Sequence, residues 1–517
     1  MTNHPTRTAI ITLLRRAITI TTVPAMAIHP AIAVGAALVI SASALSSECC
    51  HGDDAASQRH NIVFILVDDF GWNDVGYNGS TFYETPRMDQ LSKQWMRFDQ
   101  CYTPSPMCSP TRVSILTGKN PARHGVTQWL TGRDTTYVRP GETPRVYCPG
   151  PKSTAIQPSE ITLGECLQDA GYETAFYGKW HMGSLRDTGG PKRHGFASQR
   201  AVIESNGCSM FHPFGRHNYF PESQPGDNFT DQLTDAAIDF ITTERDAPFY
   251  LHLCHFAMHD PIQSKKPLRK YFQSKAEQLP TLEPDRQLDP YGHAPQKVRQ
   301  DDPDYAGELK TLDENIGRLV DSLKTSGQYD NTIIILTGDN GGRSSFFKAH
   351  PTSMRPLRTG KTFLFEGGIR TPLLIHWPNH DLAGRSSDVP VISMDFYPTV
   401  LDMIGQPLRP KQHIDGISLL PLMRGETIDR DTLHWHFPHF QGEGGYPASA
   451  IRVGDMKLIR NYQHDDVLLY DLSNDPNETK NLANSRKEQA TAMLRQLESY
   501  LNDVNAHIPE PIEPSTQ

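Results

Sequence analysis

The chain has 517 residues, of which 37% are hydrophobic and 21% charged, and this composition excludes an intrinsically disordered protein. The 50 Lys and Arg residues against 59 Asp and Glu residues give a net charge of −9 without a basic run, so we expect no nucleic acid partner. At roughly 100–200 residues per domain, the length predicts a few domains or one large α/β domain with an appendage.

The N-terminal segment differs in composition from the rest of the chain. Up to about residue 45 it contains three arginines but no Asp, Glu or Lys, and an apolar stretch at 31–40 precedes the small residues Ala42–Ala44. We predict a signal peptide over residues 1–44 and export to the periplasm or the medium, where disulfides are permitted. Pro24 and Pro30 interrupt the apolar residues that a membrane span needs, so no stable membrane insertion is expected.

From residue 61, apolar runs alternate with amphipathic segments, which is typical of a mostly parallel sheet covered by helices. We predict strands at 61–67, 172–178, 248–254, 332–337 and 373–377, and helices at 85–97, 161–170, 228–244 and 305–325. The sequence therefore predicts a large α/β domain over residues 60–410. The short strand-like segments that follow, and a helix at 485–503, predict a smaller antiparallel α+β subdomain over residues 411–517.

Polar pairs follow two of the predicted strands. Asp68 and Asp69 end the first strand, and Asp339 and Asn340 come shortly after the strand at 332–337. The crevice beyond the carboxyl ends of parallel strands is where such folds bind ligands, although an Asp in this position is also a common cap or turn residue. Three carboxylates and an amide favour Ca²⁺ or Mg²⁺ over zinc.

Cys108 is predicted to begin a helix. A proline follows two residues later, and an apolar run ends at Gly118, which is typical of a helix with its N-terminus at Cys108. Such an N-terminus favours anions. Taken alone, the cysteine would be interpreted as a buried apolar residue or half of a disulfide.

The sequence around Cys108 changes that interpretation. Residues 108–125 read CSPTRVSILTGKNPARHG, and this segment resembles the signature of the type I, formylglycine-dependent sulfatases of the alkaline-phosphatase-like superfamily. Further motifs of that family occur in the same order, namely DDFGWNDVGYNG, YGKWHMG, HFAMHDP, LTGDNGG and RTGKTFLFEGGIRTP. The resemblance covers nearly the whole chain beyond the predicted signal peptide, and it implies an α/β fold with a large mostly parallel sheet between helices.

The resemblance implies a catalytic site residue by residue. Cys108 matches the cysteine that a formylglycine-generating or radical-type maturation enzyme converts to formylglycine, whose hydrate is the nucleophile. Ca²⁺ ligands fall on Asp68, Asp69, Asp339 and Asn340. Catalytic and substrate-binding positions fall on Arg112, Lys179, His181, His259 and Lys361. In that family a proline more often precedes the histidine that matches His259, whereas this chain has Met258 at that position.

These residue types suit sulfate ester hydrolysis. Cations stabilise the nonbridging oxygens, and His259, together with Lys361, is expected to supply the proton for the bridging oxygen. His181 deprotonates the second hydroxyl of the formylglycine hydrate, so that sulfate leaves by C–O cleavage and the aldehyde re-forms. The implied enzyme is a sulfuric ester hydrolase.

The substrate is predicted to be a sulfated carbohydrate, from which an exo-acting enzyme removes sulfate. Alternatives are an arylsulfatase of broad specificity, a phosphodiesterase or phosphonate hydrolase of the same superfamily, and a noncatalytic carbohydrate-binding protein. Candidate sugar-contacting residues are Trp129, Arg133, His350, Arg355 and His436, although each of these is equally consistent with a core or surface position.

Overall fold

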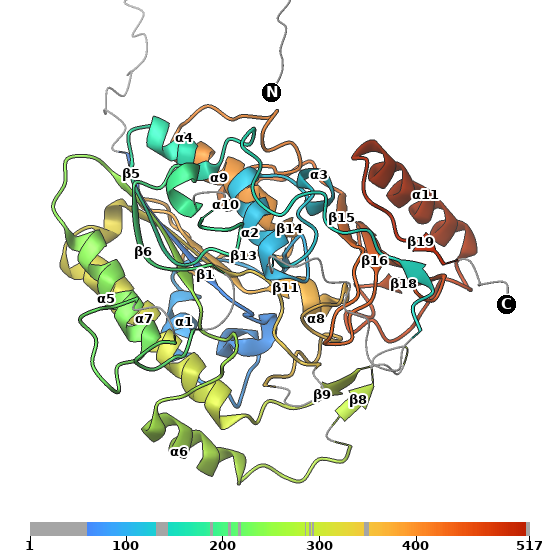
Figure 1. Ribbon diagram of the computed structural model, residues 1–517, viewed down its shortest axis with the longest axis horizontal. Helices are drawn as coiled ribbons and strands as arrows, with labels where there is room; N and C mark the ends of the chain where they lie inside the picture. The colour runs from blue at the N-terminus through green and yellow to red at the C-terminus, as the bar shows by residue number, and fades with distance from the viewer. Residues whose placement is uncertain are drawn as a thin grey trace, which may run out of the picture. The chain divides into compact units, whose positions relative to one another are not determined.

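The computed structural model describes residues 59–130, 143–186, 190–204, 208–215, 219–284, 286–288, 291, 294–345 and 351–512. These residues belong to one unit by their contacts, and Figure 1 shows their arrangement. The predicted signal peptide lies outside the described residues. Among the described residues, no helix combines the length and apolar character needed to cross a membrane. Their six cysteines are buried free thiols.

The centre of the fold is an eight-stranded sheet in the order β13-β2-β12-β10-β1-β7-β5-β6. Its central strand β1 pairs in parallel with β7 and β10, and β5 pairs in parallel with β7 and β6. β12 runs antiparallel to both β10 and β2. The mostly parallel α/β fold is therefore confirmed. The strand bounds are β1 Asn61–Val67, β2 Met96–Phe98, β5 Glu173–Lys179, β6 Ser198–Ile203, β7 Phe249–His255, β10 Thr332–Gly338, β12 Leu373–His376 and β13 Ser386–Ser387.

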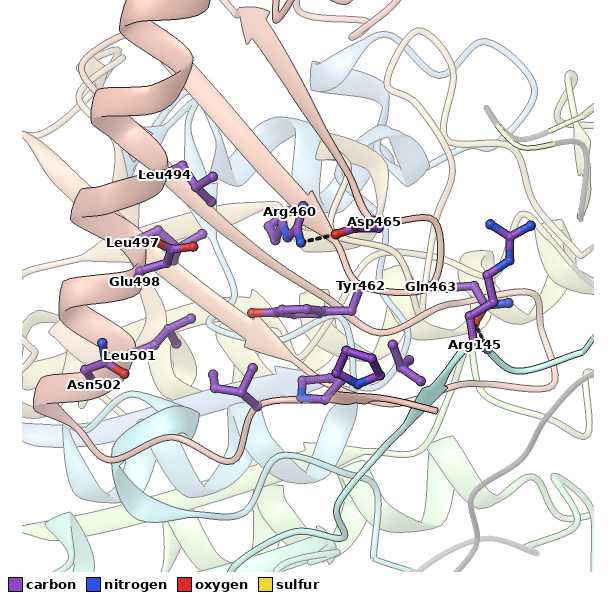
Figure 2. A pocket seen from close by; sticks show the side chains of 14 residues that line it. Arg145, Arg460, Tyr462, Gln463, Asp465, Leu494, Leu497, Glu498, Leu501 and Asn502 are labelled. Carbon is purple, nitrogen blue, oxygen red and sulfur yellow. Dashed lines mark hydrogen bonds and ion pairs between the residues drawn. The ribbon is translucent and has the colours of Figure 1, made fainter. Parts of the chain in front are cut away.

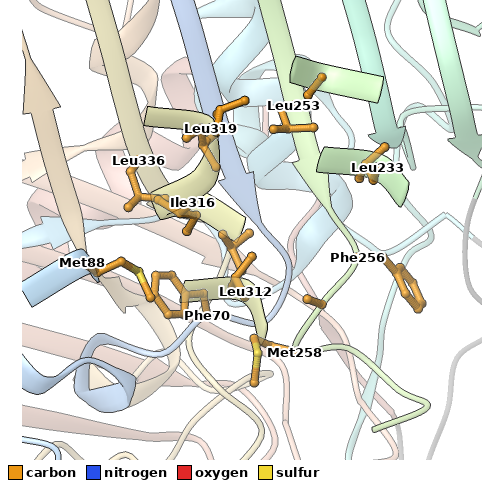
Figure 3. Close-up of a cluster of buried hydrophobic side chains, with 14 of the residues drawn as sticks. Phe70, Met88, Leu233, Leu253, Phe256, Met258, Leu312, Ile316, Leu319 and Leu336 are labelled. Carbon is orange, nitrogen blue, oxygen red and sulfur yellow. The ribbon is translucent and has the colours of Figure 1, made fainter. Parts of the chain in front are cut away.

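Helices cover both faces of this sheet. Successive side chains of β1 point to opposite faces, and all of them are buried. Val63, Ile65 and Val67 share one buried cluster with α1, α5 and α7, part of which Figure 3 shows. Ile62, Phe64 and Leu66 share another with α2, α4, α9 and α10. The helix bounds are α1 Pro86–Leu91, α2 Cys108–Thr117, α4 Leu163–Asp169, α5 Phe229–Thr242, α6 Lys266–Ala276, α7 Pro303–Thr325, α9 Phe396–Met403 and α10 Leu420–Arg424.

Short elements fill the connections. A three-stranded sheet joins β11 Arg370–Thr371, β3 Cys101–Tyr102 and β14 Val391–Ile392, while β4 Val146–Tyr147 pairs with β19 Glu510–Pro511 and β8 Arg286–Leu288 with β9 Pro295–Lys297. The short helices are α3 Pro121–His124, α8 Glu366–Ile369, and the 3₁₀ turns η1 Trp72–Asp74, η2 Gly76–Asn78, η3 Gly190–His194, η4 Tyr329–Asn331 and η5 Ser393–Asp395.

The helix predicted at 85–97 is only half correct. α1 ends at Leu91, and residues 96–98 form β2, which pairs with β12 and β13. Met96 and Phe98 are buried while Arg97 between them is partly exposed, which is the alternation of a strand. Pairing with strands distant in the sequence thus overrides the local helical pattern.

The C-terminal region forms a four-stranded antiparallel sheet of β15 Thr432–Phe437, β16 Ala448–Val453, β17 Met456–Asn461 and β18 Asp466–Asp471. The helix α11 Lys487–Asp503 covers one face through Met493, Leu497 and Leu501. The other face shares a buried cluster with residues 363–365 of the large domain. The predicted division between residues 410 and 411 stays a prediction.

A buried ion cluster also joins this sheet to the large domain. The Lys457 Nζ atom on β17 lies 2.9 Å from Glu366 Oε1 on α8 and 2.9 Å from Glu478 Oε1, and all three side chains are fully buried. The Tyr102 hydroxyl donates to the second oxygen of Glu366 at 2.6 Å. Burial raises the pKa of Glu478 to about 7. Lys457 is therefore the cation on which two buried carboxyl groups depend.

We expect Lys457→Met to lower the free energy of unfolding by about 3–5 kcal/mol, because it leaves Glu478 buried without a cation and leaves Glu366 only Arg370, at 3.5 Å. Chemical denaturation followed by circular dichroism measures this loss. Lys480→Met removes an exposed lysine and should change the stability by less than about 0.5 kcal/mol. Equal stability of the two variants would contradict the role of the cluster.

Candidate active site

The two polar pairs meet at the carboxyl edge of the central sheet. Asp68 and Asp69 follow β1, and Asp339 and Asn340 follow its parallel neighbour β10. The Asp69 backbone N–H donates to Asp339 Oδ1 at 3.1 Å, and the Asn340 amide donates to Asp69 Oδ1 at 2.8 Å. All four residues have no exposed surface. The parallel register thus brings both pairs to one buried point.

Several oxygens of this group have no hydrogen-bond partner among the described residues. They are Asp68 Oδ1, Asp69 Oδ2 and Asn340 Oδ1. Ligand atoms of Asp68, Cys108 and Asp339 also lie within 4.8 Å of one another. Because buried oxygens without partners are costly, and carboxylate and amide oxygens are hard ligands, the residues present fit a divalent cation such as Ca²⁺.

Three buried cations surround the carboxylates. Lys179 Nζ lies 2.5 Å from Asp68 Oδ2, and Lys361 Nζ lies 2.6 Å from Asp69 Oδ1. Burial alone would raise the pKa of Asp68, but Lys179 and the other cations outweigh it and hold that pKa below its ordinary value. Burial likewise opposes ionisation of Asp69, and Lys361 holds its pKa down. Both carboxyl groups are therefore ionised at neutral pH.

Arg112 joins α2 to the acidic group. Its Nε atom donates to Asp339 Oδ2 at 2.7 Å, and Nη1 donates to the Lys179 carbonyl at 2.7 Å. Burial and the neighbouring charge of Asp68 nevertheless raise the pKa of Asp339 to about 7. A bound divalent cation would favour the ionised form of this carboxyl.

Cys108 is the first residue of α2 and is 2% exposed. Its Sγ lies 3.3 Å from Nδ1 of His181, whose Nε2 lies 3.1 Å from the carbonyl oxygen of Leu130. Because a carbonyl only accepts, Nε2 carries the proton and the Nδ1 lone pair faces position 108. Burial, with Lys179, lowers the pKa of His181 well below its usual range. The imidazole is thus a neutral base directed at position 108.

His259 lies on the loop after β7. Its Nδ1 faces the carbonyl oxygen of Asp260 at 3.0 Å, and Nε2 lies 4.0 Å from Asp69 Oδ2. Burial lowers the pKa of His259 to about 3 in the chain alone. At 9% and 4%, His259 and Lys361 are the most exposed of the ten predicted site residues. They therefore lie on the more open side of the site, where a leaving group would depart.

Four of the eleven described non-glycine residues with a positive φ lie in the predicted site or next to it in the chain. Positive φ angles occur at Asp69 (54°), His181 (53°), Met258 (77°) and Thr362 (76°), two of them in the predicted set and two adjacent to it in the chain. Non-glycine residues rarely adopt such angles, and they persist where surrounding structure imposes them. At Met258, a proline could not adopt this conformation, so the departure from the family pattern comes with a distinct local backbone.

Sequence reasoning missed one ion cluster beside the site. Arg343 donates to Asp260, and its Nε lies 2.9 Å from Glu443 Oε1. Burial acts to lower the pKa of Lys361, but neighbouring negative charges outweigh it and raise this pKa. Asp69 is the largest of these charges, and Glu443 contributes in the same direction. Arg343 directly follows the motif LTGDNGG and Asp260 lies within HFAMHDP, whereas Glu443 lies in the remote loop between β15 and β16.

The candidate sugar-contacting residues have mixed positions. Trp129 is half-buried against the cluster below the C-terminal sheet. His436 is buried, with Nδ1 2.7 Å from Ser449 Oγ and Nε2 3.0 Å from the carbonyl oxygen of His507, so both ring nitrogens are occupied within the fold. Arg355 is exposed and donates to Gln287. Arg133 and His350 lie outside the described residues.

A cavity of about 500 Å³ lies elsewhere, beside α11. Figure 2 shows Leu494, Leu497 and Leu501 of α11 on one side of it and Tyr462 and Arg460 on the other. Arg460 pairs with Asp465 there. The described residues that line this cavity include no cysteine, histidine or serine, so it lacks the groups that ester hydrolysis needs.

Comparisons with known proteins identify sulfatases. The chain is 31% identical to N-acetylgalactosamine-6-sulfatase of Mus musculus over 425 residues, covering 78% of this chain and 72% of that protein. It is 28% identical to human arylsulfatase A, covering 83% and 84%. The crystal structure of Ps i-CgsB in complex with k-i-k-neocarrahexaose is 27% identical, with a TM-score of 0.69 and coverage of 86% and 93%.

The fold and the site define a hydrolase of the alkaline-phosphatase-like superfamily. The sulfatase family model matches residues 60–406, and the model for the C-terminal region of N-sulphoglucosamine sulphohydrolase matches residues 359–507. The chain belongs to the sulfatase family and is a sulfuric ester hydrolase.

Proposed function

We propose that this protein is an exported, exo-acting sulfatase of sulfated carbohydrates that uses formylglycine formed from Cys108 and a Ca²⁺ ion held by Asp68, Asp69, Asp339 and Asn340. The observation that carries the proposal is the contact of Cys108 with the unprotonated nitrogen of His181, beside buried carboxyl oxygens that lack partners. Formylglycine would supply a hydrated aldehyde as nucleophile, and Ca²⁺ would supply positive charge to the nonbridging oxygens.

The chain's own residues divide the remaining work. Lys179, Lys361 and Arg112 place fixed positive charge around the sulfate group without reorganisation during the reaction. The Nδ1 atom of His181 accepts a proton from the group at position 108. His259, on the more open side, holds a proton at Nε2 for the departing alcohol once the anionic ester raises its pKa.

The carbohydrate substrate is supported by the relatives. One is named for N-acetylgalactosamine 6-sulfate chemistry, and the structure of another contains a carrageenan hexasaccharide. The chain's net charge of −9 offers no long-range attraction for a polyanion, so binding depends on the local cations and favours fragments or chain ends. The similarity to arylsulfatase A supports a second candidate, an arylsulfatase of broad specificity.

We expect mass spectrometry of the tryptic peptide Phe98–Arg112 to show an aldehyde or its hydrate at Cys108 in active protein. Cys101 in the same peptide should remain a thiol and serves as an internal control. Cys108→Ala should fold as the parent does and lose turnover, because the lost side chain contributes chemistry. Full activity of protein with an entirely unmodified Cys108 would disprove the nucleophile.

We expect one Ca²⁺ per chain by metal analysis, with ligand distances of ~2.3–2.6 Å in a crystal structure, against ~2.0–2.1 Å for Mg²⁺. At 100 times its Kd, Ca²⁺ should stabilise the fold by about 2.7 kcal/mol. Asn340→Ala should weaken this effect, whereas Asn474→Ala, an exposed control, should preserve it. Stoichiometric zinc in place of calcium would refute the assignment.

The substrate class is tested by kcat/KM for N-acetylgalactosamine 6-sulfate, sulfated carrageenan oligosaccharides and 4-nitrophenyl sulfate. We expect a saccharide to be the best substrate, because binding energy remote from sulfur orients the ester. Consistent preference for the aryl ester, with no turnover across the saccharides, would favour the arylsulfatase candidate and leave the sulfatase assignment intact.

A further inference from the structure

The loop that carries His259 is held in a strained turn. The His259 backbone N–H donates to the Phe256 carbonyl at 3.2 Å, which closes a turn with Met258 at a φ of 77°. A positive φ at this position of a turn is usually supplied by glycine. Met258 is fully buried, in the same cluster as Leu312 of α7 (Figure 3). Contacts from outside the turn therefore have to stabilise the backbone conformation of Met258.

Glu308 on α7 makes the contacts that can do so. Its Oε2 accepts the backbone N–H of Gln263 at 3.0 Å. The backbone amide of Met258 also acts on this carboxyl, because it opposes the effect of burial, which raises the pKa of Glu308. Gln263 is fixed in turn, because its side-chain oxygen accepts the backbone N–H of Met210 at 2.9 Å. The carboxyl group thus holds the segment 258–263 by a hydrogen bond at its C-terminal end and lies beside the Met258 amide at the other end, and His259 lies within that segment.

The burial of an acidic side chain at Glu308 is not explained by an ion pair. The side chain is 2% exposed and pairs with no Lys or Arg in the described part of the chain, while Oε1 is buried without a partner. Burial raises the pKa of Glu308 well above its usual range, and the other charges that act on it, Asp302 and Asp304, are acidic too. An apolar side chain on this buried face of α7 would avoid that cost. What an acid provides here is the acceptor for the Gln263 backbone N–H, beside the Met258 amide.

We propose that Glu308 is a positioning residue that holds the 258–263 segment, and through it the His259 imidazole, where Nε2 reaches the leaving oxygen. This inference rests on the proposed role of His259. A proton donor matters most when the leaving group is poor, so misplacing the imidazole should slow poor leaving groups more than good ones. That selectivity separates positioning from a general loss of structure.

The test compares kcat and KM for phenyl sulfate, a poor leaving group, and 4-nitrophenyl sulfate, a good one. Glu308→Met keeps the length of the side chain and removes both acceptors, and we expect it to lower kcat for phenyl sulfate by about 10–100-fold with a smaller loss for 4-nitrophenyl sulfate. Glu308→Gln keeps an acceptor oxygen and should recover most of the activity. Glu314→Ala, an exposed acid on the same helix, should match the parent.

A double variant gives the decisive comparison. Glu308→Met with His259→Ala should be no slower than His259→Ala alone, because both changes remove one function. The inference would be overturned if the losses of kcat from the two single changes multiplied in the double variant, or if Glu308→Met slowed both esters equally. Either result would leave the proposed role of His259 intact. If His259→Ala itself slows both esters equally, that role and the inference both fall. Should Glu308→Met not fold, Glu308→Asp, which shortens the reach, replaces it in the same comparisons.

Discussion

The active site depends on one electrostatic constraint, the burial of three carboxyl groups at a single point. A buried carboxylate costs several kcal/mol unless a positive charge lies beside it. Here each acid has a cation in contact, in the pairs Asp68 with Lys179, Asp69 with Lys361 and Asp339 with Arg112. Because the pairs balance and the histidines are neutral, a divalent cation would give the site a net positive charge. An anionic ester, with one negative charge, would lower that charge from +2 to +1.

The same constraint explains why the site comes from so many segments. No single loop could hold three acids and three cations without repulsion between neighbours in the chain. The sheet delivers the acids from the ends of β1 and β10, α2 delivers Arg112, and β5 delivers Lys179. The acids follow core strands, Lys179 ends β5 and Arg112 lies within α2, so each of these groups is held by an element of the core. Rigid placement is what electrostatic stabilisation of a transition state requires.

Much of this could be predicted from the sequence, where the signals are local. The buried run of β1, the acids that follow it, and the helix from Cys108 to a left-handed Gly118 are each encoded within about ten residues. The antiparallel direction of β12 and the end of α1 at Leu91 depend on pairing between distant strands, which no local pattern reports. Glu443 and Glu308 escaped prediction for the same reason, since their partners lie on other elements.

The packing between residues 363–365 and the C-terminal sheet has an evolutionary consequence. This segment directly follows Lys361, and it is buried among Trp435, Phe437 and Tyr470 of that sheet. The position of Lys361, a predicted substrate-binding residue, thus depends on two regions of the chain. Recombination that exchanged the C-terminal sheet between relatives would have to preserve this contact surface. The two regions are therefore expected to evolve together and not to be exchanged independently.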